Sequence, residues 1–183
     1  MLLLLLTAGG YVAWQFWHEQ GSGTAVTISS ASAASAQQKA DAFARAAAQA
    51  QQTGRAVQVV ETFDDAELSA LANEAARAQS LPIDQISLHA TGQGTVQGHA
   101  QAHVAGQTLP VSLEGVPVVA NNRVALHVTS TQVGAIPLPG PLGDQVAQSL
   151  RQPLELGQSI AGFQNLQVTV SQGQLTVSGV AEP

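Results

Sequence analysis

The chain is 183 residues long and 45% hydrophobic, which gives room for one ordinary domain with a terminal appendage and excludes wholesale disorder. Its net charge is −6 and its six basic residues stand singly along the sequence, so the basic stripe that nucleic-acid binding needs is absent. No Cys is present, which excludes disulfides, thiolate catalysis, lipid attachment to cysteine and cysteine-type zinc sites.

Residues 2–17 form an uncharged and almost wholly apolar segment. As a helix it spans about 24 Å, slightly less than a typical hydrocarbon core. Tyr11, Trp14 and Trp17 gather at its end, where aromatic side chains sit at the headgroup level. This pattern predicts a transmembrane anchor over residues 1–20, with the lipid bilayer as a partner. A cleaved signal peptide and a buried core helix are the alternatives, and no flanking charge sets the orientation.

A linker rich in Gly, Ser, Thr and Ala follows, and then a segment rich in Ala and Gln, so that residues 21–55 form a second unit. High helix propensity predicts a helix from Ala33 to Gln52, with Gly54 just past its end. Phe43 is its only large apolar side chain. We therefore expect this helix to pack thinly, as a stalk or a lid.

A short strand is predicted at residues 57–60, and a second helix begins after it. Asp64 as N-cap with Glu67 three residues later forms a capping box, and Phe63 can meet Leu68 as a hydrophobic staple. Apolar residues then continue at helical spacing. The neighbouring acids at this point are explained by the helix cap rather than by acid–base chemistry.

Beyond this helix the apolar residues alternate with polar ones, which predicts strands with one apolar face and one solvated face. The predicted strands lie near residues 86–90, 96–104, 109–113, 116–118 and 124–128, with a turn at 121–122. A proline-rich break at 137–141, a third helix over 142–150 and a hairpin over 166–179 follow. The predicted class is α+β: a curved antiparallel β-sheet with two helices packed on its apolar face, preceded by the anchor and the Ala/Gln-rich helix. The domain itself covers residues 56–183.

The five histidines are the only candidates for chemistry. Four of them lie on the polar face of the predicted strands, namely His89, His99, His103 and His127. His99 and His103 are four residues apart, about 13 Å along a strand, and no carboxylate lies beside them in sequence. We expect solvated surface histidines rather than a metal site, and a hydrolase only if all four cluster. No nucleophile elbow is present either. The expectation is a protein that is not an enzyme and has no cofactor.

The apolar face contains small residues, Gly98, Ala100 and Ala102, in the middle of a strand. Either the helices sit close over them, or they form the floor of a groove wide enough for acyl chains. An apolar tip at 136–139 would add a second surface near the membrane. The expected walls of the groove are Ile86, Leu88, Val96, Ala100, Val104, Val111, Leu113, Leu126, Val128, Leu142, Val146 and Leu150.

Four segments in this order resemble the LmeA-like and YpmS-like families of membrane-anchored or exported bacterial envelope proteins. They are TFDDAELSALAN (62–73), VSLEGVPV (111–118), VALHVTSTQVGAIPLPG (124–140) and VTVSQGQLTVSG (168–179). The resemblance covers residues 57–179. It implies an extracytoplasmic domain with a curved, lipid-cradling sheet and phospholipid binding in some members, and it supplies no catalytic residues. The long Ala/Gln segment departs from the pattern.

The expected function is therefore that of a membrane-anchored extracytoplasmic domain, which binds a phospholipid or fatty-acyl ligand between its sheet and its helices. The alternative is a structural or assembly module of the cell envelope that binds a protein partner through a sheet edge and has a filled core.

Overall fold

The computed structural model describes residues 26–104, 106–120, 123–133, 154–155 and 163–183. The predicted anchor at 1–20, the turn at 121–122, the apolar tip at 136–139 and the third helix at 142–150 lie outside these residues. Within the described part of the chain, no helix combines the length and apolar character that a membrane crossing requires.

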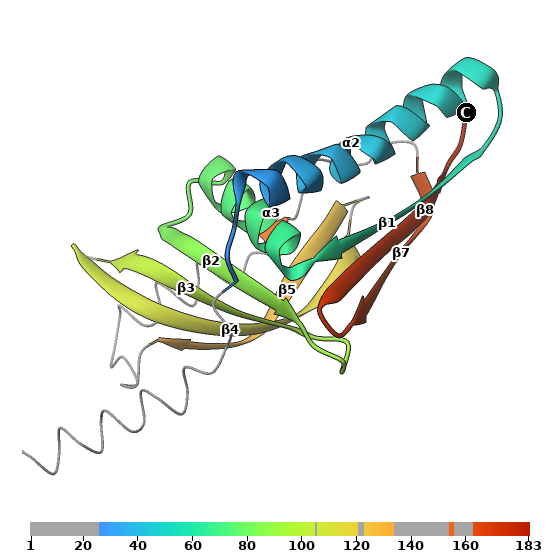
Figure 1. Cartoon of the computed structure of the whole chain (residues 1–183). Coiled ribbons are helices and arrows are strands. Elements are labelled where there is room, and N and C mark those ends of the chain that lie inside the picture. The colour runs from blue at the N-terminus through green and yellow to red at the C-terminus, as the bar shows by residue number, and fades with distance from the viewer. Residues whose placement is uncertain (1–25, 105, 121–122, 134–153, 156–162) are drawn as a thin grey trace, which may run out of the picture.

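The protein is an α+β domain in which helices pack with two antiparallel sheets (Figure 1). One sheet has three strands in the order β1-β8-β7, and the other has five in the order β2-β3-β4-β5-β6. The elements are α2 (Ser30–Thr53), β1 (Val57–Asp64), α3 (Asp65–Ala78), β2 (Ile83–Ala90), β3 (Val96–Val104), β4 (Gln107–Ala120), β5 (Arg123–Val133), β6 (Leu154–Glu155), β7 (Phe163–Ser171) and β8 (Gln174–Ala181).

The prediction of a single sheet is wrong, because the C-terminal hairpin leaves the meander and pairs with β1. The register of β1 and β8 runs from Val57 opposite Ala181 to Asp64 opposite Gln174. A cross-strand pair of hydroxyls, Thr62 and Thr176 at 3.0 Å, links the two strands near one end. The two strands are more than a hundred residues apart in the chain, and local patterning carries no information on such pairing.

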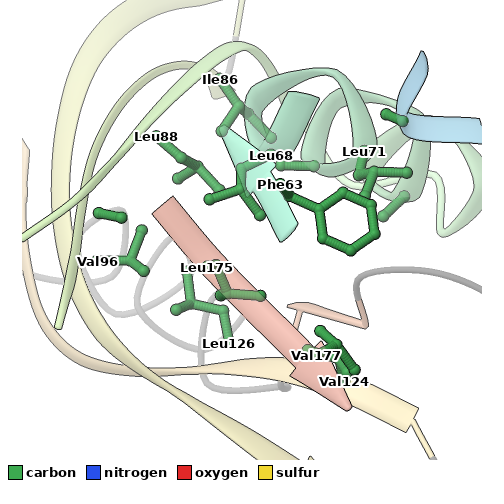
Figure 2. Packing of buried hydrophobic residues seen from close by; sticks show 14 of the residues in the cluster. Phe63, Leu68, Leu71, Ile86, Leu88, Val96, Val124, Leu126, Leu175 and Val177 are labelled. Atoms are coloured by element: carbon green, nitrogen blue, oxygen red, sulfur yellow. The ribbon is translucent and has the colours of Figure 1, made fainter. Parts of the chain in front are cut away.

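The helix α3 begins where the sequence predicts it. The Asp64 side chain accepts from the Glu67 N–H at 2.8 Å, and the Glu67 carboxylate accepts from the Asp64 N–H at 3.0 Å, which is the predicted capping box. The helix lies over β2 (Figure 1). Of its buried leucines, Leu68 points toward Ile86 and Leu88 of β2, and Leu71 lies beside Phe63 of β1 (Figure 2).

The Ala/Gln-rich helix α2 is part of the folded domain, and the expectation of a stalk is wrong. Ala36, Phe43, Ala46 and Ala50 are buried on one side of it and belong to the same hydrophobic core as α3 and the sheets. Alanines allow a helix backbone to approach its neighbours closely, and α2 lies against α3 and β1 (Figure 1). The Phe43 ring centroid is 5.5 Å from that of Phe163, so an aromatic pair joins α2 to β7.

Candidate apolar binding site

Seven of the twelve predicted wall residues come together in one packed core. Their exposed fractions are 6% or less, and Val128 is half-buried against the same cluster. The side chain of Val104 and the residues of the predicted third helix, Leu142, Val146 and Leu150, lie outside what the structure describes. The seven core residues are Ile86, Leu88, Val96, Ala100, Val111, Leu113 and Leu126.

The strand of small residues is closely covered at Gly98. A Cβ added there would lie 2.7 Å from Leu88 Cδ2 and 3.0 Å from Leu113 Cδ1, so neighbouring leucines already fill the space that the glycine leaves. Ala100 and Ala102 on the same strand are 5% and 1% exposed. On β3 the space beside Gly98 is therefore filled by large side chains of the two neighbouring strands, β2 and β4. A tryptophan at Ala100 would overpack the core.

A bulge in β5 faces the middle of β4 and separates two parts of β4 that have different surroundings. The register with β5 shifts between Glu114 and Gly115, and Thr129 Oγ1 donates to the Glu114 carbonyl at 3.1 Å beside it. Before the bulge, Val111 and Leu113 point into the core and their neighbours point outward. Beyond Gly115 that alternation of buried and open residues stops. The extra residue, Thr129, lies on β5, so the bulge changes the pairing opposite Gly115, and the buried alternation of β4 itself continues through Leu113 and Gly115.

The four residues after the bulge, Val116 to Val119, are apolar on both faces of the strand, and we name them the valine end of β4. Val119 lies opposite Val124, a core residue, so it is on the inner face of the sheet. Val116 lies opposite His127 and is on the outer face. Both valines are 38% exposed. Strands that are apolar on both faces are typical of sheets covered on both sides, so this end offers apolar surface that its own neighbours leave partly open.

The histidines do not form a common site. His89 Nδ1 is 2.5 Å from Asp65 Oδ2, His103 Nε2 is 3.0 Å from Asp84 Oδ2, and His99 Nδ1 is 3.2 Å from Ser112 Oγ. The described residues contain no group of three or more His, Asp or Glu side chains arranged to hold a metal ion. The hydrolase hypothesis required a histidine cluster, and the structure gives each of these three a separate partner.

The sequence analysis did not predict the two carboxylates that pair with His89 and His103. Asp65 comes from the first turn of α3, and Asp84 comes from the neighbouring strand. Each meets its histidine only through the packing of α3 on β2 or the pairing of β2 with β3.

A buried polar network joins the two helices. Glu67 is 4% exposed; Lys39 Nζ donates to its Oε2 at 2.6 Å, and the Ser35 hydroxyl donates to its Oε1. Burial is the largest single effect on the pKa of Glu67 and by itself raises it. The hydrogen bonds from Lys39, Ser35 and the Asp64 N–H, with the Lys39 charge, together outweigh burial and hold the pKa below its ordinary value of 4.5. The network is a clamp between α2 and α3. Ser35 and Lys39 can bond the same carboxylate because residues four apart lie on one face of a helix.

In the comparisons with known proteins, no family model matches this chain and no curated protein matches its sequence.

Proposed function

We propose that this chain is a non-catalytic, membrane-tethered extracytoplasmic domain that binds an acyl chain or a similar apolar ligand. The ligand lies on the inner face of the five-stranded sheet, at the valine end of β4, rather than across β2 and β3. Residues 2–17 anchor the domain in the bilayer from which the ligand comes. The resemblance to envelope proteins that bind phospholipid supports the same assignment.

The observation that carries this proposal is the half-covered Val119, which lies on the inner face of β4 beside core residues. Val119 continues the apolar surface of Val124 and Leu126 across the strand pair, yet it remains 38% exposed. The covered part of the same face, at Gly98, has no room for a ligand. An apolar ligand therefore finds its surface beyond the bulge.

The energy available at such a surface is modest but sufficient for acyl chains. Each methylene removed from water contributes about 0.8 kcal/mol, so a chain with several methylenes covered on one side gains a few kcal/mol in all. An acyl chain that is covered on more than one side at the valine end gains more free energy of binding. Binding at this level favours exchange with a membrane over permanent retention.

The test is to extract the full chain in a mild detergent, identify the co-extracted lipids by mass spectrometry, and titrate the delipidated protein with a dansyl-labelled fatty acid. The proposal expects an acyl lipid in near-stoichiometric amount and saturable fluorescence that an unlabelled fatty acid displaces. Protein that carries no lipid and shows no saturable binding contradicts it, and leaves the assembly module with a filled core.

A further inference from the structure

The strand β2 is an edge strand of the five-stranded sheet, as the described strands are ordered. Alternate residues of an edge strand point their backbone N–H and C=O groups away from the sheet, where they are free to pair with another strand. In β2 the residues that point outward are Ile86, Leu88 and Ala90, because their N–H groups are bonded to side chains of α3 and not to β3.

Three polar side chains of α3, four residues apart, occupy these groups in order. Asp65 Oδ1 accepts from the Ala90 N–H at 2.9 Å, and Ser69 Oγ accepts from the Leu88 N–H at 2.8 Å. Asn73 Oδ1 accepts from the Ile86 N–H at 3.0 Å, and Asn73 Nδ2 donates to the Ile86 carbonyl at 2.6 Å. We name this set the α3 ladder.

The ladder is possible because four residues of a helix and two residues of a strand span nearly the same distance. Four residues of an α-helix rise about 6.0 Å, and two residues of a strand rise about 6.6 Å. The helix runs antiparallel to the strand, so successive side chains from 65 to 73 meet successive outward groups from 90 to 86. A helix of this kind satisfies the edge as a neighbouring strand would.

The rest of the β2 edge is irregular. The register with β3 shifts between Asp84 and Ser87, and Gln85 has a φ of 50°. A bulge of this kind twists an edge away from regular pairing, and it is a common protection of exposed strands. The ladder thus covers the regular residues of the edge, and the bulge distorts the remainder.

The first turn of the helix is also held in place from outside the ladder. The second oxygen of Asp65 meets His89 at 2.5 Å, and the Glu67 carboxylate is clamped by Lys39 and Ser35 of α2. The clamp ties α3 to α2 at the end of the helix where the ladder begins.

We infer that α3 is a built-in block against pairing of the β2 edge with the β2 edge of a second copy of this chain. The ladder takes the N–H groups of Ile86, Leu88 and Ala90 and the Ile86 carbonyl, which a paired strand would otherwise take. The Ala90 carbonyl accepts from the Gly173 N–H of the β7–β8 turn at 2.8 Å. A second copy is the partner that fits, because two identical edges pair antiparallel about a twofold axis without any other protein. With α3 in place the chain stays single, and with the ladder broken it self-associates.

The test compares the double variant Ser69→Ala/Asn73→Ala with Glu74→Ala in the full chain. Alanine keeps helix propensity while it removes the bonds to β2, and Glu74 lies exposed on the same helix. At low protein concentration we expect amide exchange of Ile86 and Leu88 to accelerate about tenfold in the double variant, with no change in the control. Sedimentation should then show a dimer as the concentration rises.

The dimer should restore protection of the same two amides, because the second β2 takes the place of the ladder. A dimer that leaves Ile86 and Leu88 unprotected uses another surface and overturns the inference, as does a double variant that stays monomeric. If the double variant fails to fold, Asn73→Ala alone gives the same reading at Ile86. Unchanged exchange there overturns the inference too.

Discussion

Two regions of the five-stranded sheet, β2 with β3 and the valine end of β4, contain similar apolar residues but differ in how far these residues are buried. Over β2 and β3, each small residue on the inner face faces a larger one, and Gly98 receives Leu88 and Leu113. At the valine end of β4, the same kind of β-branched side chain is more than one-third exposed. An alternating pattern determines which face points inward, but the element that crosses that face determines whether it is covered. The helix α3 packs on β2 in the first region.

The largest expected contrast comes from one substitution made in both regions. Val96→Ala removes two methyl groups from a side chain that is 1% exposed, and it should lower the free energy of unfolding by about 2–3 kcal/mol. Val119→Ala on the half-covered end should lower it by less than about 0.5 kcal/mol. Urea denaturation of the two variants measures both values. Equal losses would mean that the valine end is as tightly packed as the core.

A smaller contrast comes from adding a methyl group instead of removing one. Gly98→Ala places a Cβ within 3.0 Å of two leucines, and overpacking of this kind should cost about 2 kcal/mol. Gly92→Ala is the matched control, because its Cβ would meet only Gln172 Cβ at 3.9 Å. Thermal or urea unfolding distinguishes them. A neutral Gly98→Ala would show that room exists over β3 after all, and would reopen the groove across β2 and β3.

A third prediction concerns the clamp that holds α2 on α3. Glu67→Gln keeps the shape but loses the charged bonds to Lys39 and Ser35, so stability at pH 7 should fall by about 1.5 kcal/mol. The exposed Glu74→Gln should have almost no effect.

The same pair of variants tests the pH dependence. Because the pKa of Glu67 is lowered in the folded state, its stabilisation is complete above 4.5 and is lost as the pH falls through the lowered value. Between pH 7 and pH 3, wild type should therefore lose more stability than Glu67→Gln. Parallel pH profiles for the two proteins would show that the carboxylate is not stabilised by the clamp.

Local signals in the sequence were sufficient for several of the described elements, although the strands predicted at 109–113 and 116–118 are one strand, β4. The capping box at Asp64 and Glu67, the αL residue Gly54 after α2 and the alternation along β2 and β3 each predicted structure within a few residues of where it lies. These features depend on neighbours in the chain, and so the chain alone reveals them.

The features that sequence reasoning missed all depend on pairing over long distances. Strand β1 pairs with β8 at the other end of the chain, which splits the expected single sheet. The Ala-rich side of α2 looked too thin to pack, but small side chains are what close helix packing needs. The α3 ladder consists of three polar residues at spacing four. The sequence did not predict their role, because it depends on the edge of β2 that lies beside them in the fold. The predicted groove walls were mostly core residues, because periodicity does not distinguish a filled face from an open one.

The most direct test of the ligand surface is the affinity of the delipidated chain for a dansyl-labelled fatty acid, compared between Val119→Gln and Val116→Gln. The two valines are equally exposed on one strand and point to opposite faces, so they differ only in the side of the sheet they report on. We predict that Val119→Gln weakens binding about tenfold or more while Val116→Gln leaves it within about twofold of wild type. Equal effects, or a loss only at Val116, would contradict a ligand on the inner face.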